Sequence, residues 1–130
     1  MIIAVDIGNT NVTIGMFCQE KIVKNFRITT QMARTSDEYG VLLREFLTSA
    51  GFGVEDVEDV VIASVVPNIM YSFTSAIKKY FKLTPIIVGP GIKTGIRLAA
   101  ENPKEVGADL IVDAVAVKEL YGGPAIVIDY

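Results

Sequence analysis

The chain has 130 residues, of which 51% are hydrophobic and 21% charged, and its formal net charge is −3. These values predict a compact domain with buried strands, and they argue against a nucleic-acid groove or an anionic membrane surface as a partner. Because the chain contains no histidine, Ser-His-Asp and Cys-His catalysis and the usual zinc sites are excluded.

The first predicted element is a strand that leads into an acidic, glycine-containing turn. An apolar run over residues 2–5 continues as Asp6-Ile7-Gly8-Asn9-Thr10-Asn11, and a second strand follows over residues 12–17. The aspartate can hold a hydrated cation, Gly8 allows the backbone to approach a phosphate, and the threonine and asparagine add short donors. The pattern predicts a phosphate-binding β-hairpin. An ordinary hairpin turn is the alternative, because short glycine-containing turns are common.

A third strand over residues 21–28 follows a tight Gln19-Glu20 turn, so the first three strands form an antiparallel meander. Thr35 and Glu38 then predict a capping box. The apolar side chains that follow at helical spacing predict a helix that ends at Gly51.

The rest of the chain alternates strands and helices. The predicted elements are a strand at 60–65, a helix from Pro67 to Phe81, a strand at 85–88, a loop to residue 100, a helix from Asn102-Pro103-Lys104-Glu105 to about Tyr121, and a strand at 125–130. The order β-β-β-α-β-α-β-α-β predicts an α/β fold. Its sheet is mixed, with the antiparallel meander on one side and helices on both faces.

Known phosphate-binding motifs are missing from the sequence. It has neither G-x-x-x-x-G-K-[ST] nor G-x-G-x-x-G, which excludes a Walker loop and argues against a Rossmann dinucleotide site. Aspartates at the ends of strands and helices remain as candidates. Carboxylates suit phosphoryl transfer, where they position Mg²⁺ and accept the proton of an attacking hydroxyl.

Asp109, in Gly107-Ala108-Asp109-Leu110, is the most informative of these aspartates. It lies early in the third predicted helix, and Asp113 falls on the same face one turn later. If both carboxylates faced a dry cleft, one would resist ionisation and become a better base. The alternative is that both point to water on an amphipathic helix, as most aspartates do.

Four blocks of the sequence resemble type III pantothenate kinase, in the family's order and across the whole chain. They are Asp6-Ile7-Gly8-Asn9-Thr10-Asn11, Ser64-Val65-Val66-Pro67, Gly89-Pro90-Gly91-Ile92-Lys93-Thr94-Gly95-Ile96 and Gly107-Ala108-Asp109. The family belongs to the acetate and sugar kinase, Hsp70 and actin superfamily. The resemblance therefore implies an actin-like ATPase domain of the ribonuclease H-like type.

The resemblance also implies an activity. Members phosphorylate pantothenate to 4'-phosphopantothenate in the first step of coenzyme A biosynthesis, using ATP, Mg²⁺ and a monovalent cation such as K⁺ or NH₄⁺. It implies a small-molecule substrate and a homodimer, whereas the charge and composition predict no nucleic-acid or membrane partner. The start of the chain lacks the basic flank of a signal peptide and no apolar run is long enough to span a bilayer, so we expect a cytoplasmic protein.

Carried over residue by residue, the resemblance assigns a site. The residues expected around the ATP phosphates are Asp6, Ile7, Gly8, Asn9, Thr10, Asn11, Val12 and Thr13, with Asp6 near the magnesium. Those expected to line the pantothenate site are Gly107, Ala108, Asp109 and Leu110, with Asp109 as the general base. Asp129 is expected to help bind the monovalent cation, and the loop ending at Thr94-Gly95 to border the substrate pocket. Leu110 departs from the arginine usual in the family, which removes a bidentate partner for a carboxylate or a subunit contact.

The resemblance also implies that the chain contains parts of two domains. We expect residues 1–124 to form the N-terminal domain and residues 125–130 the first strand of a second, similar domain, so the chain alone should be inactive or nearly so. Two other functions stay open. One is another kinase of the superfamily that acts on a small sugar or acid, and the other is a non-catalytic regulatory protein of the same fold.

Overall fold

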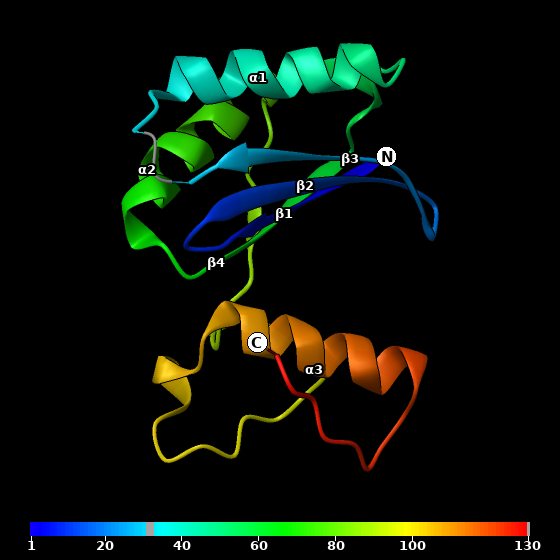
Figure 1. Ribbon diagram of the computed structural model, residues 1–130, viewed down its shortest axis with the longest axis vertical. Coiled ribbons are helices and arrows are strands. Elements are labelled where there is room, and N and C mark those ends of the chain that lie inside the picture. Colours follow the sequence, from blue (N-terminus) through cyan, green and yellow to red (C-terminus); the bar gives the residue numbers. More distant parts are fainter. Residues whose placement is uncertain (31–32, 130) are drawn as a thin grey trace.

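A computed structural model describes residues 1–30 and 33–129, which form a five-stranded mixed sheet with helices on both faces (Figure 1). The strands are β1 (Ile2–Ile7), β2 (Asn11–Cys18), β3 (Lys21–Thr29), β4 (Asp59–Ser64) and β5 (Ile86–Ile87). They lie in the order β3-β2-β1-β4-β5. The first three strands pair antiparallel, and β4 is parallel to β1 and β5 to β4. The predicted α/β fold with its antiparallel meander is confirmed.

Helices α1 (Ser36–Ser49) and α2 (Pro67–Ala76) cover one face of the sheet, and α3 (Ala108–Leu120) lies on the other (Figure 1). The strands place alternate side chains on the two faces. On β1, Ile3, Val5 and Ile7 are buried beneath α1 and α2 and belong to the hydrophobic core. That core draws its buried residues from β1, β2, β4, α1, α2 and the turns next to them, and none from α3.

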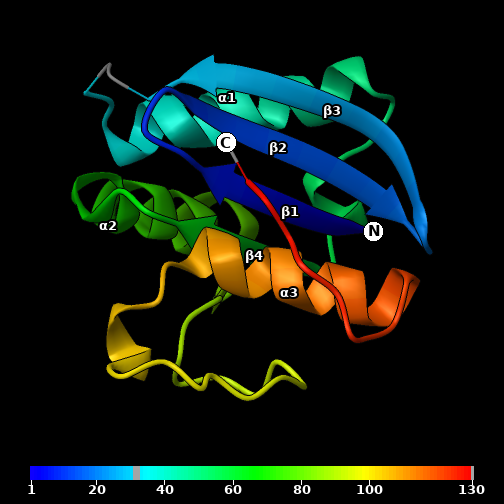
Figure 2. The same cartoon turned by 60° about the horizontal axis from the view of Figure 1, so that its bottom comes forward.

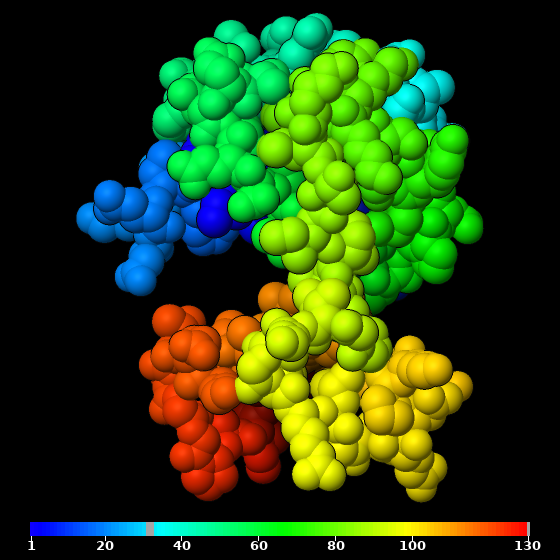
Figure 3. Space-filling view, turned by 180° about the vertical axis from the view of Figure 1, so that it is seen from behind, coloured from blue at the N-terminus to red at the C-terminus, as the bar shows by residue number. Residues whose placement is uncertain are grey.

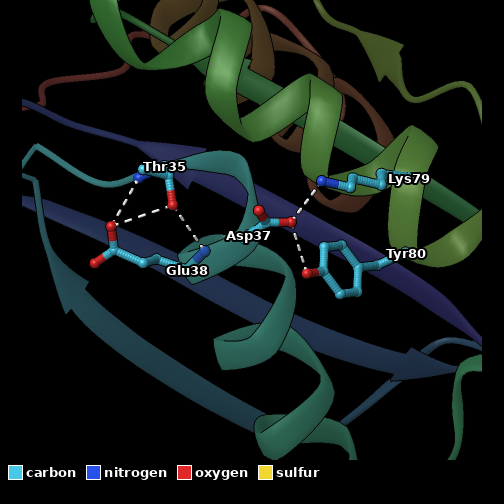
Figure 4. A network of polar contacts seen from close by, with 5 residues as sticks. All are labelled: Thr35, Asp37, Glu38, Lys79 and Tyr80. Carbon is cyan, nitrogen blue, oxygen red and sulfur yellow. Dashed lines mark hydrogen bonds and ion pairs between the residues drawn. The ribbon is translucent and has the colours of Figure 1, made fainter.

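Helix α1 begins and ends as the sequence predicts. The Glu38 N–H donates to Thr35 Oγ1 at 3.2 Å, and the Thr35 N–H donates to Glu38 Oε1 at 3.1 Å (Figure 4). This is the predicted capping box. After the helix, Gly51 has a φ of +86°, a conformation that favours glycine.

The helical segment that starts at Pro67 changes its hydrogen-bonding pattern before it ends. Helix α2 stops at Ala76, and residues Ile77–Phe81 continue as one turn of π-helix. Lys82, with a φ of +56°, then terminates the segment. The predicted end at Phe81 is correct, but the change in helix type is not visible in the apolar spacing.

The predicted start of the third helix at Asn102 is wrong. Asn102 makes no side-chain cap hydrogen bond, and Pro103–Glu105 form only a short 3₁₀ turn. Val106 and Gly107 are then extended, and α3 starts at Ala108 with Gly107 as its N-cap. The extended backbone at these two residues separates the 3₁₀ turn from the helix that follows.

The prediction of a strand at 125–130 is wrong for residues 125–129, which form no strand, and Tyr130 lies outside the described residues. The free edges of the sheet are β3 and β5. Residues 121–129 instead run back over α3 and across the face of the sheet, where no strand edge can pair with them (Figure 2). The assignment of this segment to a second domain stays a prediction. None of the helices among residues 1–30 and 33–129 is long and apolar enough to cross a bilayer.

Candidate functional site

A cavity of about 750 Å³ lies between α3 and the face of the sheet opposite the core. Figure 3 shows the hollow between these two parts of the molecule. Its floor is made by small and apolar side chains of the central strands, among them Ala4, Gly15, Val61 and Ala63. Its charged lining residues are Asp6, Arg27, Asp109, Asp113 and Asp129.

One row of paired residues crosses the floor of this cavity. Asp6 on β1 is paired with Ala63 on β4 and with Thr13 on β2, and Thr13 is paired with Arg27 on β3. Residues in register on neighbouring strands share a face, so Asp6, Thr13 and Arg27 project on the side of α3. The row carries an acid, a hydroxyl and a guanidinium.

The four carboxylates come from separate parts of the chain. Asp6 is on β1, Asp109 and Asp113 lie one turn apart on α3, and Asp129 is in the segment that crosses the sheet. The structure therefore brings Asp6, Asp109 and Asp129, all singled out in the sequence, to one cavity. Asp109 and Asp113 are half-buried and do not simply face bulk water.

The crowding of like charges affects the acidity of two of these groups. Burial, and then the nearby carboxylates of Asp109 and Asp129, raise the pKa of Asp6. Burial, and then Asp129, Asp109 and Asp6, raise the pKa of Asp113. In the folded protein the Asp113 carboxylate therefore resists ionisation. A bound cation would relieve this repulsion.

The Asp109 carboxylate is held at the N-terminal end of α3. Its Oδ1 atom accepts a hydrogen bond from the Leu110 N–H at 2.9 Å. A Cβ atom at Gly107 would lie only 2.5 Å from the same oxygen, so the glycine leaves the space that the carboxylate fills. Asp109 lines the cavity, whereas Gly107, Ala108 and Leu110 do not, and Leu110 is exposed.

The β1–β2 turn forms the end of the hairpin next to Asp6. The Gly8 N–H donates to the Asn11 carbonyl at 2.9 Å, and a Cβ atom at Gly8 would approach that oxygen to 3.3 Å. Asn9 and Thr10 are exposed, and their N–H groups donate to no acceptor among residues 1–30 and 33–129. A tight turn with free amides is suited to binding an anion.

The eight residues expected around ATP lie in three places: the cavity lining, the turn beside it and the core. Asp6 and Thr13 line the cavity, and residues 8–11 form the turn beside it. The side chains of Ile7 and Val12 are fully buried in the core, so only their backbone could meet a ligand. The hairpin therefore lies beside the cavity, and the alternation of the strands decides which of its side chains are accessible. Its contact with ATP stays a prediction.

Two residues of the site were missed from the sequence. Arg27 lines the cavity, and Thr30 bonds the β1–β2 turn through its side chain. The pairing of the two hairpins could have identified Arg27, because it places every second residue of β3 on the same face as Asp6. Nothing in the sequence pattern distinguishes Thr30 from Thr29.

The glycine-rich loop borders a second, smaller pocket of about 210 Å³. Thr94, Ile96 and Leu98 line it together with Ile111 of α3, and Lys118 Nζ donates to the Gly95 carbonyl. The loop therefore packs against α3 and does not line the larger cavity. Its predicted contact with substrate stays a prediction.

A cation at the larger cavity would need ligands from a bound molecule. Among the described residues, no three acidic, histidine or cysteine side chains converge closely enough to hold a metal ion. Mg²⁺ in phosphoryl-transfer enzymes is commonly held by one or two carboxylates, waters and substrate phosphates. The acidic lining fits a cation shared in this way.

Comparison with known proteins identifies relatives of the whole chain. The family model described as type III pantothenate kinase matches residues 2–130. A protein named type III pantothenate kinase from Agathobacter rectalis is 58% identical to the chain over 130 residues. The match covers all of this chain and 50% of that relative, so the chain spans about half its length.

Proposed function

The chain belongs to the type III pantothenate kinase family, and from this premise we propose that its protein transfers the γ-phosphoryl group of ATP to the hydroxyl of pantothenate. The product is 4'-phosphopantothenate, the first intermediate towards coenzyme A. The observation that carries the proposal is the cavity in which Asp109 of α3 faces the Asp6 end of the hairpin.

Asp109 serves as the general base. Its Oδ1 is occupied by the Leu110 N–H, and its other carboxylate oxygen has no donor among the described residues. That oxygen accepts the proton of the pantothenate hydroxyl. The hydroxyl oxygen then forms a bond to the γ-phosphorus as the bond to the β-phosphate oxygen breaks, and ADP leaves.

The hairpin binds the phosphates of ATP. The free amides of Asn9 and Thr10 and the hydroxyl of Thr13 supply neutral donors, and Arg27 supplies a positive charge on the cavity wall. Donors that are already fixed stabilise the charge of the transferring group without reorganisation. Catalysis therefore rests mainly on positioning and electrostatics.

Two cations complete the proposed site. Asp6 would hold Mg²⁺ together with ATP oxygens, and Asp129 would help hold a monovalent cation such as K⁺. Both cations would offset negative charge on the phosphates and on the carboxylates that line the cavity. A cytoplasmic location and a homodimer complete the proposal, and both rest on the family membership.

The proposal is tested with protein expressed from the complete reading frame. Phosphopantothenate and ADP are measured with and without pantothenate, in K⁺ and in Na⁺. We expect ADP release to require pantothenate and to be faster in K⁺. ADP release that is independent of pantothenate, or no phosphopantothenate in either salt, would contradict the proposal.

A further inference from the structure

We propose that Thr30 is a positioning residue, which holds the β1–β2 turn in the conformation that binds phosphate. The inference rests on the proposed function, because it concerns the same hairpin. Thr30 directly follows β3 and is 6% exposed, and it is the buried polar residue of the described part of the chain. A buried hydroxyl requires a hydrogen-bond partner, and this one has its partner in the turn.

Thr30 makes two hydrogen bonds to the turn. Its Oγ1 donates to the Gly8 carbonyl at 2.8 Å, and its backbone N–H donates to the Thr10 carbonyl at 3.0 Å. The second bond continues the β2–β3 ladder and would form with any residue except proline at position 30. The first bond depends on the side chain, and it reaches across β2 to Gly8, the residue directly after β1.

These bonds fix the direction of two peptide groups. In a planar trans peptide the carbonyl oxygen and the following N–H point in opposite directions. Because the Gly8 and Thr10 carbonyls point to Thr30, the N–H groups of Asn9 and Asn11 point away from it. Thr30 therefore orients amides on a turn whose tip residues, Asn9 and Thr10, are exposed.

The loss of the Thr30 hydroxyl should free the Gly8–Asn9 peptide to rotate. Thr30→Val has the same shape without the hydroxyl, so the core packing is kept and the side-chain bond is lost. Thr30→Ser keeps the hydroxyl. Thr29→Val is the matched control, because Thr29 is exposed, lies one residue earlier and accepts a hydrogen bond from Arg34 through its backbone carbonyl and not its side chain.

The experiment measures KM for ATP, KM for pantothenate and kcat in the protein from the complete reading frame. We expect Thr30→Val to raise KM for ATP about five- to tenfold, the effect of one lost hydrogen bond, with KM for pantothenate little changed. Thr30→Ser and Thr29→Val should resemble the unmodified protein. A merely structural role would lower the melting temperature and leave both KM values unchanged, which would overturn the proposal.

Two further measurements separate this inference from the function and from folding. Calorimetric binding of a non-hydrolysable ATP analogue should show the same five- to tenfold loss, even if pantothenate is not the substrate. Hydrogen exchange on the unmodified protein should show protection of the Asn9 amide, the free amide that the Thr30 side chain orients, when the analogue binds. If the Asn9 amide is not protected, the turn does not bind phosphate in this way and the role of Thr30 is refuted, whether or not Thr30→Val folds.

Discussion

At the scale of single residues, Gly107 has a chemical consequence for Asp109. A methyl group at position 107 would lie 2.5 Å from Asp109 Oδ1, so the carboxylate of Gly107→Ala must turn away. Because a side-chain end can move at little cost, we expect a melting temperature close to that of the unmodified protein. The proposed base is displaced, however, so kcat should fall at least about tenfold.

The measurement compares kcat and thermal unfolding of Gly107→Ala with those of Gly91→Ala. A Cβ atom at Gly91 meets nothing within 4 Å, which makes it a control for the same substitution in open space. Unchanged kcat in Gly107→Ala would show that the observed Asp109 position does not matter for turnover.

Arg27 gives a second prediction at this scale. It is the basic residue among those that line the cavity, so Arg27→Gln should lower kcat/KM for ATP at least about tenfold through loss of a charged hydrogen bond. Lys24→Gln is the control, because Lys24 loses the same charge on the same strand but does not line the cavity. Equal effects of the two variants in steady-state kinetics would indicate a general effect of charge and not a contact.

The sequence identifies cavity-lining residues where a carboxylate follows an apolar run or a pair of small residues. Asp6 and Asp129 follow apolar runs, Asp109 follows Gly107 and Ala108, and the three line one cavity. Arg27 and Thr30 are ordinary residues on an amphipathic strand and beyond its end. Their positions depend on how the two hairpins pair, which is a property of the sheet.

At the scale of the elements, the contact between α1 and the π-helical turn is set by Gly40. A Cβ atom at this position would overlap the Tyr80 ring. Alanine forms helices better than glycine by about 1 kcal/mol, whereas overpacking costs about 1–3 kcal/mol. We therefore expect Gly40→Ala to lower the free energy of unfolding in urea, although it improves helix propensity.

The double variant Gly40→Ala/Tyr80→Ala tests the cause. Removal of the ring also removes the overlap, so the two changes should be less destabilising together than the sum of their separate effects. Additive effects would mean that Gly40 matters for another reason. A Gly40→Ala variant more stable than the unmodified protein would contradict the prediction directly.

The sequence predicts the bounds of a helix well where capping residues mark both of its ends. The capping box of Thr35 and the αL glycine at position 51 fix α1 at both ends. Asn102 is a residue typical of a cap, but the extended residues Val106 and Gly107 interrupt the segment, and the third helix starts six residues after Asn102. The segment 125–129 has the composition of a strand, but a strand forms only where it can pair with the free edge of another strand.

At the scale of the whole molecule, one face of the sheet is apolar and the other is charged. The face under α1 and α2 is a dry core, and the face under α3 gathers four carboxylates around a cavity. Because the pKa of Asp113 is raised in the folded state, the folded protein binds more protons than the unfolded chain between the two pKa values. Protonation of Asp113 therefore favours the folded state at low pH. That stabilisation is lost as pH rises through the folded pKa and the carboxylate ionises.

We therefore expect Asp113→Asn to raise the melting temperature at neutral pH. This increase should shrink as pH falls towards the usual aspartate pKa of about 3.9. Asp37→Asn is the control of opposite sign. Hydrogen bonds from Lys79 and Tyr80 lower the pKa of Asp37, so its contribution is present at neutral pH and lost as pH falls through that pKa (Figure 4). A lower melting temperature for Asp113→Asn at neutral pH would contradict the proposed charge repulsion.

The most direct test of the proposed site measures turnover and ATP-analogue binding for Asp109→Asn in the protein from the complete reading frame. The amide keeps the shape of the carboxylate but cannot accept the proton of the pantothenate hydroxyl. The account predicts a loss of pantothenate-dependent turnover of at least about a hundredfold, with the affinity for the analogue nearly unchanged. Near-normal turnover would show that Asp109 is not the base.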